Sequence, residues 1–133
     1  MESANAPNLK FLTMAEAHYR PVCEADLEAF ASMASVSFSF DAKEAPKWFE
    51  KAGHENMRVL DKSGQIVAGL IRVPMGLWIA GNSIPTVGVS GVATPPESRN
   101  QGHCKEMMKQ FLIEEKSQGS PLSSLYAATF HLY

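Results

Sequence analysis

Cysteine is scarce in this chain, because Cys23 and Cys104 are the only two and they lie far apart in the sequence. Two thiols cannot supply the several bridges of a disulfide-rich secreted domain or the four ligands of a structural zinc site. We therefore predict reduced, unbridged cysteines and no bound metal.

Long apolar runs and blocks of one charge sign are also missing. No stretch is apolar over a membrane-spanning length, and Met1–Pro7 lacks the basic and apolar regions of a secretory signal, which predicts a cytoplasmic protein without a membrane partner. The 12 lysines and arginines stand against 14 aspartates and glutamates, a net charge of -2. Nucleic acid is therefore not expected as a partner.

What the chain does contain fits a globular protein. Its 133 residues are 45% hydrophobic and 20% charged, the size and balance of one domain with its own core. In residues 1–17 the apolar residues follow neither a helical nor a strand period, and we predict a loose N-terminal segment. Residues 18–133 are predicted to form the domain.

Two helices are predicted after a short first strand. Tyr19–Val22 is strand-like, and Pro21 confines it to a sheet edge or to the end of the strand. From Ala25 onward, apolar residues at helical spacing predict a helix with one buried face, namely Leu27, Phe30, Ala31, Ala34 and Phe38. A second helix is predicted from Asp41, whose side chain can cap it while Glu44 reaches back.

Strand-like patterns fill the middle of the chain. Met57–Leu60 and Gln65–Val73 flank a turn and predict a hairpin, and Met75–Ala80 and Ser83–Thr94 predict another. Consecutive hairpins make an antiparallel meander.

The last part of the chain is predicted to be a helix followed by a strand. The helix follows Gly102, and its apolar stripe consists of Cys104, Met107, Met108, Phe111 and Leu112. Leu122–Ala128 then forms a strand parallel to Val87–Thr94, because a helix between two strands provides the crossover that parallel pairing requires.

The junction between Val92 and Met108 is the most informative stretch. It runs from a strand through two prolines and Gly102 into a helix. Backbone N–H groups at a helix start have no intrahelical partner, so an anion is stabilised there, and glycine allows close approach. Turns use the same residue types for local reasons, and the pattern alone is weak evidence.

The segment Arg99-x-x-Gly102-x-Cys104 resembles the acyl-coenzyme A loop of the GNAT acetyltransferase superfamily, in which a smaller residue usually takes the last position. The surrounding sequence is most similar to the Eis (enhanced intracellular survival) type of N-acetyltransferase. That similarity rests on the strand Val87–Pro95, on this loop, and on Ser123–Ala128 followed by Tyr133.

The resemblance implies acetyl-coenzyme A as cosubstrate. The backbone of Val92, Ala93 and Thr94 would hydrogen-bond the pantetheine arm and polarise the thioester carbonyl. The pyrophosphate would meet the loop residues, which are Arg99, Asn100, Gln101, Gly102, His103 and Cys104. Because Asn100 and Gln101 replace the arginines common in the family, and Cys104 is larger than usual, we expect weaker cofactor binding.

The resemblance also assigns a catalytic residue. Tyr133 falls where the family keeps the tyrosine that protonates the departing thiolate, although a tyrosine after a strand can equally serve packing. A role as base for His103 is disfavoured because we expect it to face solvent, and His131 is expected to be an exposed terminal residue. Aromatic residues could line an acceptor pocket or simply belong to the core; they are Phe38, Phe40, Trp48 and Phe49.

The implied fold is a GNAT-like mixed α/β sheet, an antiparallel meander plus one parallel strand pair, with helices on both faces. In the family another helix and two strands follow. We therefore expect an incomplete domain with an open sheet edge, which is a fragment, a truncated gene product, or a subunit completed by another chain or in a homo-oligomer. The implied function is transfer of an acetyl group to a primary amine, on an aminoglycoside-like small molecule or a protein lysine. The alternative is an inactive coenzyme A-binding or assembly module.

Overall fold

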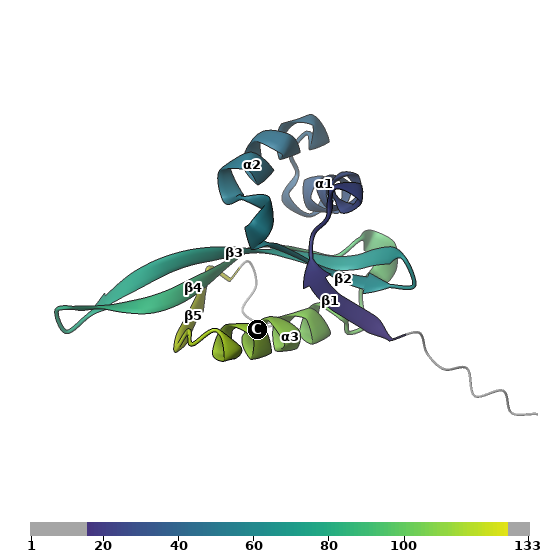
Figure 1. Ribbon diagram of the computed structural model, residues 1–133. Helices are drawn as coiled ribbons and strands as arrows, with labels where there is room; N and C mark the ends of the chain where they lie inside the picture. Colours follow the sequence, from purple (N-terminus) through teal and green to yellow (C-terminus); the bar gives the residue numbers. More distant parts are fainter. Residues whose placement is uncertain (1–15, 128–133) are drawn as a thin grey trace, which may run out of the picture.

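The computed structural model describes residues 16–127, which form one five-stranded sheet (Figure 1). The strands lie in the order β1-β2-β3-β4-β5, with the first four antiparallel and β5 parallel to β4. Their bounds are Ala17–Pro21, Met57–Lys62, Gln65–Ile79, Asn82–Ala93 and Leu122–Leu125. This confirms the predicted mixed sheet. Ala17, assigned from sequence to the loose segment, already belongs to β1.

Helices cover both faces of the sheet, as predicted (Figure 1). Helices α1 (Leu27–Phe38) and α2 (Ala45–Ala52) lie on one face, and α3 (His103–Ser117) lies on the other. Each face has its own apolar cluster. The first is built around Phe30, Met33 and Phe49, and the second around Leu70, Met107 and Phe111.

The second helix begins later than predicted. Asp41 does act as a cap, because its carboxylate accepts a hydrogen bond from the Lys43 N–H at 2.9 Å. The turn that follows is a 3₁₀ turn over Ala42–Glu44, and α-helical geometry starts at Ala45.

The strands predicted on either side of Pro74 are one continuous strand, β3. Pairing with β2 ends at Ile71, so Pro74 lies where β3 has β4 as its one partner within residues 16–127. A proline is tolerated at such a sheet edge because it can leave its missing N–H on the unpaired side. Beyond this point β3 and β4 continue as a two-stranded arm (Figure 1).

The buried faces of α1 and α3 differ in part from the predicted stripes. Phe30, Ala34, Met107 and Phe111 are buried as expected. Phe38 is 45% exposed at the last position of α1, and Leu112 is 49% exposed, so both assignments to the core were wrong. The buried row of α3 instead consists of His103, Met107, Phe111 and Glu115, successive positions four apart on one helix face.

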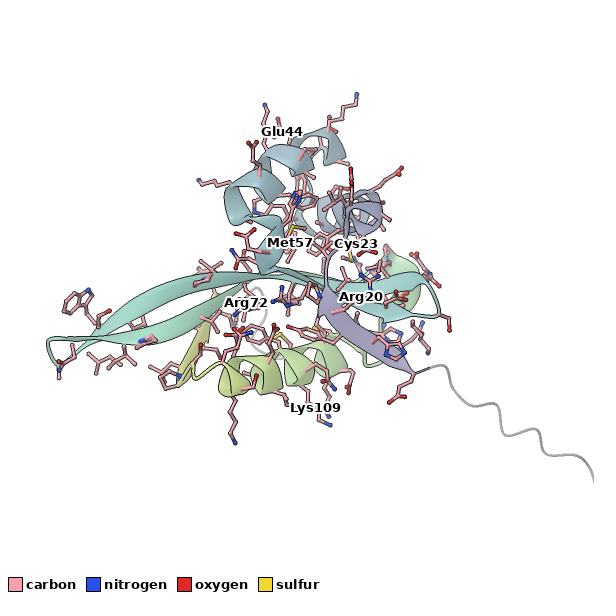
Figure 2. The ribbon with its side chains drawn as sticks, viewed as in Figure 1. Arg20, Cys23, Glu44, Met57, Arg72 and Lys109 are labelled. Atoms are coloured by element: carbon pink, nitrogen blue, oxygen red, sulfur yellow. The ribbon has the colours of Figure 1, made fainter. Side chains whose placement is uncertain are left out.

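Charged groups fasten the end of α3 to the sheet. Arg58 is 5% exposed, and its guanidinium forms an ion pair with the Glu114 carboxylate at 2.8 Å. The Tyr19 hydroxyl donates to the same carboxylate at 2.5 Å. Arg72 pairs with the buried Glu115, and Figure 2 shows it between the sheet and α3. Burial and the bond to Glu114 raise the pKa of Tyr19. Burial opposes ionisation of Glu114, but hydrogen bonds from Arg58 and Tyr19 outweigh it and lower the pKa of that carboxyl.

A second ionic cluster ties β1 to its neighbours. Arg20 bridges Asp26 at 2.6 Å and Asp61 at 2.8 Å, so it links the start of α1 to β2. The hydrogen bond from Arg20 is the main reason why the pKa of Asp26 lies well below its usual range. In the described part of the chain no helix is long and apolar enough to cross a membrane.

We predict that Glu114→Gln lowers the free energy of unfolding by about 3 kcal/mol, because the buried Arg58 guanidinium loses its charged partner. Equilibrium unfolding in urea measures the change, with Glu28→Gln on the exposed face of α1 as the control. The pKa of Glu114 is lowered from its ordinary value of 4.5, so its contribution is present above that pH and disappears as the pH falls through the folded-state pKa. An equal difference between wild type and Glu114→Gln at acid and neutral pH would contradict the assignment.

Candidate functional site

The loop between β4 and α3 is held by bonds within itself. A 3₁₀ turn over Pro96–Ser98 opens it, and Asn100 and Gly102 have positive φ angles of 59° and 81°. Both residue types tolerate this left-handed conformation. The Arg99 guanidinium donates to the Thr94 carbonyl at 3.2 Å, and the Gln101 amide donates to the Glu97 carbonyl at 2.9 Å. The loop is therefore preformed.

The N-terminus of α3 has no side-chain cap. Gly102 occupies the cap position and offers no oxygen, and the first hydrogen bond into the helix runs from the Glu106 N–H to the Gly102 carbonyl. The N–H groups of His103, Cys104 and Lys105 precede it and have no acceptor within the helix. Together with the helix dipole, three such donors favour an anion.

A bulge in β4 lies directly before this loop. Between the pairs Gly69↔Ala93 and Ile71↔Ser90, β4 uses one residue more than β3, and Gly91 has a positive φ of 59°. A Cβ on Gly91 would lie 2.8 Å from the Trp48 ring, so the strand needs glycine here.

Pairing between β4 and β5 stops just short of the bulge. Its last pair is Val89↔Leu125, which leaves β4 from Ser90 onward without a β5 partner in the part of the chain that is described. Backbone groups at the end of β4 are thus available on that side.

A pocket of about 400 Å³ lies where the β4 end, the loop and the start of α3 meet. Eight of the nine predicted cofactor-binding residues line it, namely Val92, Ala93, Thr94, Arg99, Asn100, Gly102, His103 and Cys104. Gln101 does not line it and faces a neighbouring hollow with Lys62 and Glu97. The tertiary structure therefore brings the predicted set together with one exception.

Three lining residues escaped the sequence analysis: Ser37, Ser98 and Lys105. Ser98 and Lys105 directly flank the predicted motif. Because Lys105 lies in the first turn of α3, extending the motif by one helical turn predicts it as well. Ser37 comes from the last turn of α1, on the opposite face of the sheet from α3. Nothing in the linear sequence indicates that this turn reaches the pocket.

His103 at the head of α3 is less exposed than expected, and Cys104, predicted to belong to the buried stripe, is half-buried. His103, predicted to face solvent, is 9% exposed, because the first residue of α3 continues the buried row of Met107 and Phe111. Burial lowers the pKa of His103, and nearby Lys62 adds to the effect. Burial raises the pKa of the half-buried Cys104 thiol. Both cysteines are free, and Cys23 is exposed.

The aromatic residues divide between core and surface. Phe49 is 2% exposed and packs edge-to-face on Phe30. Phe38 and Phe40 stand edge-to-face against Trp48, with ring centroids 6.3 and 5.8 Å apart. Since Trp48 contacts the β4 bulge at Gly91, this cluster borders the end of β4.

Two residues with predicted roles lie outside the described residues. Tyr133 and His131 are outside residues 16–127, so their predicted roles stay predictions. Among the described residues, no three histidine, cysteine or acidic side chains come together as metal ligands.

Solved structures share this fold. A GCN5-related N-acetyltransferase from Anabaena variabilis matches with a TM-score of 0.85 at 27% identity, over 89% of this chain and 30% of that one. A predicted acetyltransferase from Clostridium acetobutylicum, solved with acetyl-CoA, has a TM-score of 0.63 at 17% identity, over 84% of this chain and 81% of that one. Eis1 from Mycobacterium abscessus has a TM-score of 0.74 at 15% identity, over 89% of this chain and 29% of that one, which shows the fold alone.

Sequence comparison identifies the family. No curated protein matches this chain. The acetyltransferase (GNAT) domain profile matches residues 18–133, which include all of β1 except Ala17, the candidate pocket and β5. Because the match covers nearly the whole sequence, the chain belongs to the GNAT acetyltransferase domain family.

Proposed function

We propose that this domain binds acetyl-coenzyme A in the pocket between β4 and α3 and transfers the acetyl group to a primary amine, as an Eis-type N-acetyltransferase. One observation carries the proposal: the family's loop residues line a single pocket in front of an uncapped helix N-terminus. The chain spans 30% of the length of the Anabaena relative, so the proposal concerns the chemistry of this domain.

The residues at the head of α3 fit a pyrophosphate. The N–H groups of His103, Cys104 and Lys105 would donate to its oxygens, and the Lys105 ammonium would add a positive charge. A Cβ at Gly102 would meet no protein atom within 4 Å, so the space beside the loop is open. Arg99 holds the Thr94 carbonyl and thereby fixes the two ends of the loop.

The end of β4 fits the pantetheine arm. An extended amide chain can pair with free strand edges, and β4 beyond Val89 offers such an edge next to the pocket. Val92, Ala93 and Thr94 would hold the arm in register through their backbone groups, and one of these N–H groups would polarise the thioester carbonyl.

When bound, acetyl-coenzyme A supplies an activated acetyl thioester. The amine nitrogen forms a bond to the carbonyl carbon while the carbon–sulfur bond breaks, and the amine gives up one proton to water. The Tyr133 phenol, with an ordinary pKa of about 10, donates a proton to the departing thiolate. His103 is an unsuitable base because it is buried in the row that packs α3 on the sheet.

The acceptor amine would approach from the aromatic cluster of Phe38, Phe40 and Trp48. This cluster borders the β4 bulge, and Ser37, beside Phe38, lines the cofactor pocket. The hollow at Trp48 is also lined by Lys47 and Lys51 against a single carboxylate from Glu44. That balance of charge favours an acceptor with one amine, such as a lysine side chain, over a polycationic aminoglycoside.

We predict that Gly102→Asp weakens coenzyme A binding by more than about tenfold, because a carboxylate at the head of α3 repels the pyrophosphate and competes for its N–H donors. Gly102→Asn is the matched control, since it has the same shape, tolerates positive φ and carries no charge. Isothermal titration calorimetry measures both. Equal affinities in the two variants would show that no phosphate binds at this loop.

We predict that acetyl-coenzyme A protects Cys104 from iodoacetamide and leaves Cys23 unprotected. Without the ligand, the exposed Cys23 reacts first, because burial raises the pKa of Cys104 and lowers its thiolate fraction. Peptide mass spectrometry over a time course distinguishes the two sites. The same labelling rate at Cys104 with and without saturating acetyl-coenzyme A would place the ligand elsewhere.

We predict that Tyr133→Phe lowers amine-dependent thiol release about 10²–10⁴-fold while acetyl-coenzyme A affinity stays unchanged, because a proton donor acts in the transition state. Turnover is assayed on lysine-containing peptides and aminoglycosides. Tyr126→Phe is the control, since Tyr126 is fully exposed. Undiminished turnover in Tyr133→Phe would remove this residue from the mechanism.

A further inference from the structure

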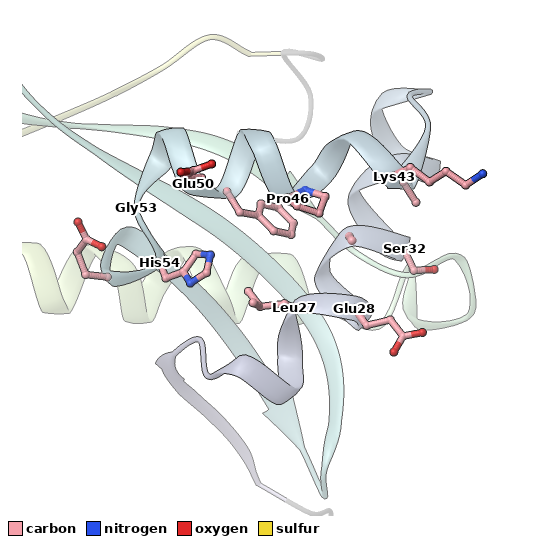
Figure 3. Close-up of a pocket in the computed structure, with 12 residues that line it drawn as sticks. Leu27, Glu28, Ser32, Lys43, Pro46, Glu50, Gly53 and His54 are labelled. Atoms are coloured by element: carbon pink, nitrogen blue, oxygen red, sulfur yellow. The ribbon is translucent and has the colours of Figure 1, made fainter.

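A large cavity among residues 16–127 is separate from the cofactor pocket. It measures about 940 Å³ and lies between α1 and α2 (Figure 3). None of its lining residues lines the cofactor pocket. The two cavities share only a helix, since the first half of α1, Leu27–Ser32, borders the large cavity and Ser37 in its last turn borders the other.

The middle of the cavity is apolar. Phe49 forms part of its wall and is held in place by the buried cluster of the α1 and α2 face. Leu27 and Ala31 contribute from α1, and Pro46 contributes from α2. Figure 3 shows Leu27 and Pro46 on opposite sides of the central space. The size and apolar walls are those of a small-molecule site, which typically measures about 300–1,000 Å³.

The rim of the cavity is acidic. Glu28, Glu50 and Glu55 line it, against the single ammonium of Lys43. In the described part of the chain none of these three carboxylates takes part in a salt bridge. Figure 3 shows Glu50 and His54 at one end of the cavity and Lys43 with Ser32 at the other. A cation bound at the Glu50 end would therefore be attracted without having to displace an existing partner.

We propose that this cavity binds a small amphipathic amine, with an aromatic or aliphatic body between α1 and α2 and a protonated nitrogen at the Glu50 and Glu55 end. Burial of the apolar body against Phe49 supplies most of the affinity. The unpaired carboxylates select a cation over a neutral or anionic molecule of the same shape. This site is distinct from the acceptor position proposed beside Trp48, so the inference does not depend on the transferase proposal.

The test uses 1-naphthylmethylamine and its uncharged counterpart 1-naphthylmethanol, titrated into the 133-residue protein by calorimetry. We expect the amine to bind more tightly, and we expect its advantage to shrink as salt is added. Acetyl-coenzyme A should not displace it, because the two cavities share no lining residue. Equal affinity for the amine and the alcohol, or competition with acetyl-coenzyme A, would overturn the proposal.

Variants locate the probe. Glu50→Gln and Glu55→Gln should each weaken amine binding about 2–5-fold, the range of partly exposed ion pairs, and leave alcohol binding unchanged. Glu44→Gln is the matched control, because Glu44 is an exposed carboxylate that lines the hollow at Trp48 instead. An equal loss in Glu44→Gln would place the probe at the aromatic cluster and refute the site.

A blocking variant completes the experiment. Ala31→Phe adds a bulky side chain to the α1 wall of the cavity and should abolish binding of both compounds. Circular dichroism and thermal unfolding check that this variant folds. Should it fail to fold, Ser32→Trp places bulk at an exposed lining position and tests the same point, and unchanged affinity in a folded blocking variant counts against the cavity.

Discussion

The docking of α3 on the sheet is the interaction on which the candidate site depends. Met107 and Phe111 bury the middle of the helix, and the pairs Arg58–Glu114 and Arg72–Glu115 fasten its end. A 15-residue helix fastened at its far end and packed along its length holds its first turn in a fixed position. Preorganised donors do not have to be rearranged when a ligand arrives, so the cost of binding is reduced.

Backbone geometry supplies most of the chemistry of the pocket. The N–H groups at the head of α3 and the free edge of β4 are main-chain groups, and Gly91 and Gly102 create the bulge and the cap that leave them open. Side chains mainly hold these main-chain groups in position, as Arg99 does by donating a hydrogen bond to the Thr94 carbonyl. This explains how the loop can carry Asn100 and Gln101 in place of more basic residues and still form the same pocket.

The two faces of the sheet differ in how they are covered. The α3 face is closed by an apolar cluster and ion pairs, and it positions the turn that we propose as the phosphate site. The face covered by α1 and α2 carries the aromatic cluster at Trp48 and the large cavity with its acidic rim. Helix α1 borders both cavities, with its first half at the large cavity and Ser37 at the cofactor pocket.

The sequence by itself determined the elements and the loop. Alternating and helical periods predicted the meander, the helices and the parallel last strand, because strands, turns and helix starts are local features. The resemblance of the loop around Gly102 to the GNAT acyl-coenzyme A loop predicted eight of the pocket's lining positions. Tertiary structure decided what depends on distant contacts. Pro74 continues a strand because pairing with β2 has already ended, and Phe38 and Leu112 are exposed because no element within residues 16–127 covers them fully. Ser37 reaches the pocket from another helix, and the cavity between α1 and α2 exists because their packing leaves space between them, which no linear pattern records.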